Sequence, residues 1–202
     1  MIIHQLFPEP LYFSSLERVL TQEELKIFNE HKKKTRKNDG NTTSSDSYVL
    51  EHKVLKNLKK DLHTKVMDYF DKVVCTNNIT PYITQSWINY TESDQFHLMH
   101  FHPNSLVSGI FYVSADKKVD TVTFRKSYLD DKIKLNATKY NIFNSSTCTY
   151  PVETGNILFF RSSLGHGVDK KKGNNIRISL SFNIFIKGTI GDSKALTELI
   201  LE

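Results

Sequence analysis

The stretch with the most regular pattern reads Ile176-Arg177-Ile178-Ser179-Leu180-Ser181-Phe182-Asn183-Ile184. Its even positions are all apolar and its odd positions are all polar. Successive side chains of a strand point to opposite faces, so the alternation predicts a strand with one face in a core. On the other face, Arg177 and Ser179 can bind one carboxylate together if that face lines a cavity. A strand with its polar face in water would show the same alternation.

Upstream of this stretch, short apolar or alternating segments follow one another from residue 83 onward. We expect further strands near Ile83–Tyr90, His97–His102, Leu106–Val113, Val119–Phe124, Thr147–Val152 and Asn156–Arg161. Seven or more short strands separated by turn residues indicate a mainly β sandwich or barrel, and a jelly roll is one way for such sheets to manage their edges.

The first third of the chain has the period of a helix instead. Thr21-Gln-Glu-Glu24 has the form of a capping box, so we expect a helix from there to about Lys34. A second helix should carry a buried apolar stripe made of Leu55, Leu58, Leu62, Val66, Tyr69 and Val73. We therefore expect one domain, 1–202, in which 1–80 is largely helical support and 81–188 is the β core.

Two polar or terminal segments complete this outline. Residues 38–47 are rich in Asn, Asp, Ser and Thr, and we expect a mobile loop that does not pack. The tail after Gly188 is expected to form one short helix.

Charge and composition narrow the classes of partner. The 27 basic residues exceed the 22 acidic ones only slightly, which does not favour nucleic acid, and the basic runs 32–37 and 170–172 resemble exposed loops and helix ends. Cys75 and Cys148 are far apart and suggest neither a disulfide framework nor a thiolate zinc site. With no apolar stretch long enough for a bilayer and no leader pattern, we expect a soluble, cytoplasmic protein without a membrane partner.

Three of the eight histidines lie in the run Asp94-Gln-Phe-His97-Leu-Met-His100-Phe-His102-Pro103. Residues two apart on a strand share a face, so His100 and His102 can share one metal ion. His97 is out of phase with both and is expected to face away. Pro103 has no amide hydrogen and should end the pairing of the strand.

His166 is the best candidate for a third ligand. An apolar segment precedes it, and we expect it in a turn between Gly165 and Gly167, where the backbone can approach other groups closely. A single histidine is more often an ordinary polar residue than a ligand. The prediction of a metal site therefore depends on finding the three histidines together with Arg177 and Ser179.

Together these residues resemble the Fe(II)- and 2-oxoglutarate-dependent oxygenases of the double-stranded β-helix fold, and most closely a subgroup of viral and bacterial members. The matching residues are Trp87 and Asn89, His100-Phe-His102-Pro103-Asn-Ser105, Ser108-Gly109, Tyr112-Val113, Gly155, Phe160, His166, and Arg177-Ile178-Ser179-Leu-Ser181-Phe182-Asn183. The resemblance spans residues 85 to 185 and does not extend to the helical front.

The resemblance implies a jelly roll with buttressing amino-terminal helices, and a hydroxylase as the activity. It implies Fe(II) held by His100, His102 and His166, with no catalytic residue beyond the metal centre. It further implies 2-oxoglutarate held by Arg177 and Ser179, with dioxygen as the other cosubstrate. Trp87, Asn89, Tyr112 and Asn183 are expected to line the pocket.

One residue departs from the pattern of the larger superfamily. His102 stands where most members have an acidic ligand, which leaves the ferrous site one unit more positive and should favour a dianionic cosubstrate. Asp94 and Asp169 are alternative acidic ligands, but neither shares the register of His100.

Two other readings remain open. A three-histidine, cupin-like dioxygenase would not use 2-oxoglutarate, and a non-catalytic jelly-roll module would bind or assemble without chemistry. The sequence does not identify the substrate, which could be a protein side chain or a small molecule, and it leaves the oligomeric state open. The polar segment 126–146 is expected to form the rim of the pocket.

Overall fold

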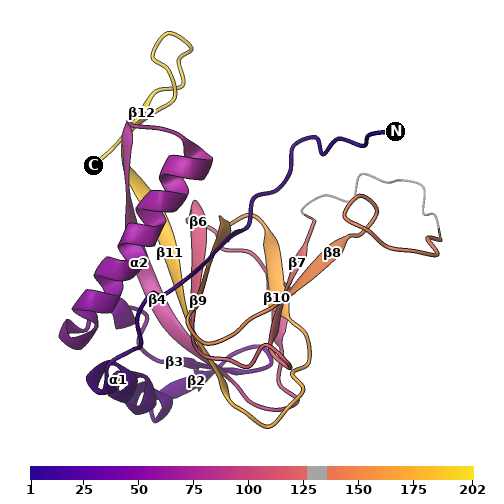
Figure 1. Cartoon of the computed structure of the whole chain (residues 1–202). Coiled ribbons are helices and arrows are strands. Elements are labelled where there is room, and N and C mark those ends of the chain that lie inside the picture. Colours follow the sequence, from indigo (N-terminus) through magenta and orange to yellow (C-terminus); the bar gives the residue numbers. More distant parts are fainter. Residues whose placement is uncertain (127–135) are drawn as a thin grey trace.

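A computed structural model describes residues 1–126 and 136–202, and it consists of two facing antiparallel sheets with helices against one of them (Figure 1). The larger sheet has the strand order β1-β9-β6-β11-β4-β3-β2, with β12 also pairing with β11, and the smaller sheet has the order β5-β10-β7-β8. This mainly β, jelly-roll architecture is the predicted fold class.

The strands of the larger sheet are β1 (Tyr12–Ser15), β2 (Thr35–Lys37), β3 (Thr42–Ser44), β4 (Ile79–Thr91), β6 (Val107–Ser114), β9 (Asn156–Arg161), β11 (Arg177–Ile190) and β12 (Leu199–Leu201). Those of the smaller sheet are β5 (His97–His100), β7 (Thr121–Arg125), β8 (Thr147–Pro151) and β10 (Gly165–Val168). Each of the seven predicted strands is present, with ends that shift by a few residues.

The helices cover the outer face of the larger sheet, as Figure 1 shows for α1 and α2. These are α1 (Gln22–Lys32) and α2 (Lys56–Tyr69), with short helical turns η1 (Val49–Glu51), η2 (Lys53–Leu55) and η3 (Phe70–Val74). The capping box is confirmed, because Thr21 accepts from the amide of Glu24 while the Glu24 carboxylate accepts from the amide of Thr21.

Two apolar clusters hold the layers together. The outer one joins the stripe of α2 to the even positions of β11, so Leu180, Phe182 and Ile184 lie beneath the helices as the alternation predicts. The inner one lies between the sheets and includes Tyr112, Phe124 and Phe160. The odd positions of β11 therefore face inward toward the smaller sheet.

Two predictions for the amino-terminal and carboxy-terminal segments are wrong. The polar segment 38–47 is not a loop without packing: β3 pairs with β4, and the Ser44 hydroxyl accepts from the buried amide of Ile88. The tail forms the strand β12, not a helix, because Leu199–Leu201 pairs with the end of β11. Beside its helices, the front of the chain also contributes β1, β2 and β3 to the larger sheet.

A bulge in β5 sets the register beside the histidines. His166 of β10 lies opposite His100 and Val168 lies opposite His97, so two residues of β5, Leu98 and Met99, match the single residue Gly167 of β10. Such an extra residue turns the side chains that follow or precede it onto the other face.

Within the described ranges 1–126 and 136–202, no helix has the length and apolar character that crossing a bilayer requires.

Candidate active site

His100, His102 and His166 converge between the two sheets. Their possible ligand atoms all lie within 4.8 Å of one another, and the Nε2 atoms of His100 and His102 are 3.1 Å apart. Metal–imidazole bonds are about 2.0–2.1 Å long, so two nitrogens at this spacing can bind the same ion. His100 ends β5, His102 follows two residues later, and His166 lies on the adjacent strand β10.

Each of the three rings has its Nδ1 atom tied to an oxygen. His100 Nδ1 is 2.7 Å from the carbonyl of Leu98, and His166 Nδ1 is 3.1 Å from the carbonyl of Leu164. A carbonyl oxygen only accepts, so these Nδ1 atoms carry the hydrogen and the Nε2 atoms keep free lone pairs. His102 Nδ1 makes the equivalent bond, 2.7 Å long, to the side-chain oxygen of Asn183. Orienting bonds of this kind are typical of histidines that bind metals.

The surroundings also favour the neutral form of two of the three imidazoles, those of His102 and His166. Burial, with smaller contributions from His100 and His102, lowers the pKa of His166 to about 2. Burial lowers the pKa of His102 as well, although its bond to Asn183 opposes the change. A metal ion binds only the neutral ring, so the lowered pKa values of these two residues favour metal binding.

His166 lies on a strand and not in the predicted turn, and only one of its two flanking glycines is needed for a close approach. A Cβ atom at Gly167 would come within 2.9 Å of the carbonyl oxygen of His97, whereas at Gly165 the nearest atom would be 3.7 Å away. Gly167 therefore lets β5 and β10 approach each other at the metal cluster.

The prediction that His97 faces away from the site is wrong. Its ring stacks on that of His100 with centroids 4.3 Å apart, and it lines the same cavity. The bulge in β5 reverses the face of His97 relative to a regular strand. Its Nε2 is 3.2 Å from the side-chain amide of Asn38, and burial lowers its pKa to about 3.

The two acidic alternatives to His102 are engaged elsewhere. Asp94 is mostly exposed and pairs with Lys170 at 3.0 Å, and Asp169 accepts a 2.7 Å hydrogen bond from Thr123. Neither belongs to the histidine cluster. In the described part of the chain, the cluster therefore consists of three imidazoles without a carboxylate.

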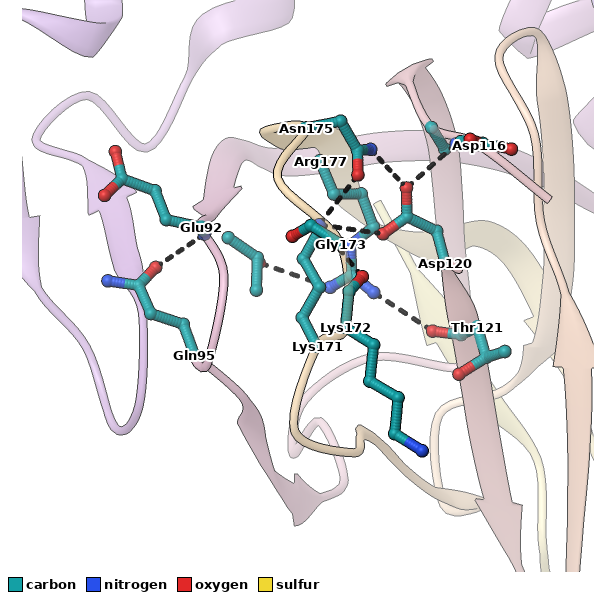
Figure 2. Close-up of polar contacts among 12 residues, drawn as sticks. Glu92, Gln95, Asp116, Asp120, Thr121, Lys171, Lys172, Gly173, Asn175 and Arg177 are labelled. Atoms are coloured by element: carbon teal, nitrogen blue, oxygen red, sulfur yellow. Dashed lines mark hydrogen bonds and ion pairs between the residues drawn. The ribbon is translucent and has the colours of Figure 1, made fainter. Parts of the chain in front are cut away.

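Arg177 lies on β11, across the cavity from the histidines, and only 2% of its surface is exposed. Its Nη1 donates to the carbonyl of Thr121 at 3.0 Å (Figure 2), and its Nη2 donates to the hydroxyl of Thr91 at 3.3 Å. Its Nε is buried without a hydrogen-bond partner, and no carboxylate of the described residues lies within ion-pair distance. Burial lowers the pKa of this guanidinium, which Tyr112 and Asp120 oppose.

Except for Asn183, the other predicted pocket residues also line this cavity. Ser179 follows Arg177 on the inward face of β11, and the rings of Trp87 and His102 have centroids 5.4 Å apart. Asn89 donates to Ser181 at 3.1 Å while its side-chain oxygen is buried without a partner. Burial raises the pKa of Tyr112 to about 12, which keeps its hydroxyl a neutral donor. Asn183 contacts His102 but is not among the residues that line the cavity.

Sequence reasoning missed several residues beside this cavity. Ile110 and Val122 form part of its wall, and the Ser108 hydroxyl is 3.2 Å from His102 Nδ1. Ser108 could have been predicted as a site residue, since it belongs to the motif that resembles the oxygenases. The expected rim, 126–146, falls partly on residues 127–135, which lie outside the described residues.

Comparisons with known proteins agree with this arrangement. Residues 85–183 match the sequence model of the family described as "Putative 2OG-Fe(II) oxygenase". That range contains every residue of the predicted metal and cosubstrate sites. No curated protein sequence is measurably similar to the chain.

Several solved structures share the fold at low sequence identity. An oxidoreductase of the 2OG-Fe(II) oxygenase family from Burkholderia pseudomallei is 14% identical, with a TM-score of 0.55 over 85% of this chain and 83% of that one. HygX from Streptomyces hygroscopicus, solved with nickel, 2-oxoglutarate and hygromycin B, is 12% identical, with a TM-score of 0.56 over 85% and 82%.

A third relative is viral. The collagen prolyl hydroxylase of Paramecium Bursaria Chlorella virus-1, solved with 2-oxoglutarate, is 13% identical, with a TM-score of 0.53 over 86% of this chain and 95% of that one. The fold is thus shared across the length of the domain, and the sequence match covers the part that carries the site. The family model, which matches residues 85–183, supports a 2OG-Fe(II) oxygenase, and the solved structures share the fold of this chain.

Proposed function

We propose that His100, His102 and His166 hold the Fe(II) ion of this oxygenase, and that Arg177 and Ser179 hold the far carboxylate of 2-oxoglutarate. The donor set suits the metal, because three imidazoles converge while their Nδ1 atoms are held by oxygen atoms, which leaves the Nε2 atoms to face the ion. These three side chains would hold the ion, and the cavity beside them would remain for 2-oxoglutarate and for dioxygen.

The observation that carries the proposal is the buried, unpaired Arg177. Placing a cation in a protein interior costs free energy unless an anion or several hydrogen bonds compensate for it. Arg177 has two compensating hydrogen bonds, one of them long, and a free Nε. A carboxylate in the cavity would supply the missing charge, and a guanidinium binds a carboxylate with two parallel hydrogen bonds.

The reaction that we propose is hydroxylation of a bound substrate. Iron and 2-oxoglutarate, when bound, supply the oxidising chemistry in which 2-oxoglutarate and dioxygen yield succinate and carbon dioxide. The protein's own residues orient the reactants: Asn183 fixes the tautomer of His102, and Trp87 packs against that ring. The surrounding side chains limit the access of water to the cavity, about 390 Å³ including its open mouth.

The substrate is a protein side chain or a small molecule in our proposal. Both kinds occur in the names of the structural relatives, as collagen and as hygromycin B. The net charge of +5 is too small to favour nucleic acid. Two exposed free cysteines, Cys75 and Cys148, fit a reducing compartment such as the cytoplasm.

The test is a titration of the purified protein with Fe(II) and then 2-oxoglutarate without oxygen, followed by the visible charge-transfer band of the complex. We expect one ion per chain and saturable binding of 2-oxoglutarate. Succinate should then form when oxygen is admitted. As a control, the variant Arg177→Ala should bind the ion but show a much weaker band.

Two outcomes would favour the competing functions. Tight Fe(II) binding without affinity for 2-oxoglutarate would indicate a three-histidine dioxygenase of the cupin type. Failure to bind any divalent ion would indicate a non-catalytic binding module.

A further inference from the structure

A lysine and an aspartate form a buried pair beside Arg177. The side chains of Lys171 and Asp120 are 1% and 0% exposed, and Lys171 Nζ is 3.8 Å from Asp120 Oδ1. Lys171 lies in the loop before β11, and Asp120 directly precedes β7. The basic run 170–172 was predicted to be exposed, which is wrong for its middle residue only, because Lys170 and Lys172 are exposed.

Asn175 bridges the two charges, as Figure 2 shows. Lys171 Nζ donates to the Asn175 side-chain oxygen at 2.8 Å and to the Gly173 carbonyl at 3.1 Å. The Asn175 side-chain nitrogen donates in turn to Asp120 Oδ2 at 2.7 Å, and the Asp116 amide donates to the same oxygen at 2.8 Å. Asp120 Oδ1 has no hydrogen-bond partner among the described residues, so Lys171 is the cation that supplements the two hydrogen bonds to Oδ2 in compensating for the charge of this carboxylate.

The Lys171–Asp120 pair can influence Arg177 through a neighbouring hydrogen bond and through electrostatic attraction. Thr121, the next residue after Asp120, supplies the carbonyl that accepts from Arg177 Nη1. The negative charge of Asp120 also reaches Arg177, since it opposes the effect of burial on that guanidinium. Without Lys171, the buried carboxylate of Asp120 and the buried guanidinium of Arg177 would compensate for each other's charge.

We propose that Lys171 is a positioning residue for the cosubstrate: by neutralising Asp120, it leaves the charge and the free Nε of Arg177 available to the far carboxylate of 2-oxoglutarate. The inference rests on the proposed function of Arg177. Competition between two carboxylates for one guanidinium is its physical basis, since interactions of buried charges are screened much less than those at the surface. Asp120 would compete with the far carboxylate of 2-oxoglutarate for Arg177, and the ion pair with Lys171 reduces this competition.

The experiment compares the dissociation constants of two ligands for the Fe(II) protein without oxygen. The probes are 2-oxoglutarate and 2-oxopentanoate, which chelates a metal through the same two groups but lacks the far carboxylate. In Lys171→Met, the dissociation constant for 2-oxoglutarate should rise at least about tenfold, and that for 2-oxopentanoate should stay within about twofold. Lys172→Met, the same change at the exposed neighbour, should alter neither constant.

Replacing Asp120 should not weaken the binding of 2-oxoglutarate. Asp120→Asn removes the competitor, so its dissociation constant for 2-oxoglutarate should equal that of the wild type or fall below it. The double variant Lys171→Met/Asp120→Asn should return to within about threefold of the wild type. Replacing both members of a buried pair is generally better tolerated than replacing one, so this variant remains informative if Lys171→Met does not fold.

Several results would overturn the inference while leaving the cosubstrate assignment intact. These are an unchanged affinity for 2-oxoglutarate in Lys171→Met, an equal loss for both ligands, or a tenfold loss in either variant that carries Asp120→Asn. Any of them would make the pair a purely structural element. If the wild-type protein binds no 2-oxoglutarate, the cosubstrate assignment itself fails, and this inference with it.

Discussion

The two ends of the cavity are built in opposite ways. At the metal end, three imidazole rings each donate one hydrogen bond from Nδ1 to an oxygen and present Nε2 to the cluster. At the other end, Arg177 keeps its charge in a buried position and has an unused donor. The first end is prepared for a cation and the second for an anion.

The metal end and the carboxylate end of the cavity also depend on contacts with different parts of the fold. The metal end is built on one sheet: His100 and His102 are two residues apart, and His166 pairs with His100 across the adjacent strands β5 and β10. The carboxylate end joins both sheets, because Arg177 of β11 contacts Thr91 of β4 in the larger sheet and Thr121 of β7 in the smaller one. A substitution at one end should therefore leave binding at the other end largely intact.

The largest effect is expected for His166→Ala. Losing one of three protein ligands should weaken metal binding by far more than the roughly 10–100-fold typical of an outer partner. Calorimetric titration with Fe(II) or Mn(II) would measure it, with His52→Ala, a change at an exposed histidine away from the cluster, as the control. Retention of wild-type metal affinity would remove His166 from the site.

Arg177→Ala should reduce the affinity for 2-oxoglutarate by at least about tenfold and leave the metal bound, because it removes one partner of a buried charge-assisted contact. Arg177→Lys keeps the charge but not the planar fork, so its loss should be smaller. Arg36→Ala, at an exposed arginine, is the matched control. If Arg177→Ala also released the metal, the two ends would not be independent.

Asn183 tests the orientation of the metal end. Asn183→Leu removes the acceptor for His102 Nδ1, so metal affinity should fall by roughly 10–100-fold. The Ser108 hydroxyl lies 3.2 Å from the same nitrogen and can replace part of that bond, so the loss of metal affinity should be closer to about tenfold than to about 100-fold. Asn183→Asp retains an acceptor and should bind the metal at least as well as the wild type. A weaker metal affinity in both variants would argue against this role.

The smallest effect is expected for His97→Ala. His97 stacks on His100 but contributes no atom to the cluster within 4.8 Å, so metal affinity should fall by less than about tenfold. His97→Asn, which keeps a polar side chain near Asn38, should lose still less. A loss as large as that of His166→Ala would make His97 a fourth ligand.

Much of the fold followed from local pattern. The alternation of 176–184 and the helical stripe from Leu55 to Tyr69 each reflect burial on one face, and periodicity records that directly. The short strands β1, β2, β3 and β12 left no such signal. They contain few residues, and their pairing with longer strands, not their own composition, makes them strands.

The same division holds at the site. His100, His102 and His166 could be predicted because their spacing and glycine context are local properties, as is the position of Arg177 on an alternating strand. Tertiary structure alone decided the face of His97, because the bulge arises from pairing with β10. It also decided the burial of Lys171, which lies among exposed lysines and becomes an interior cation because the folded chain places Asp120 and Asn175 beside it. A buried charge depends on a distant partner of opposite sign, and that partner is not visible in the neighbouring sequence.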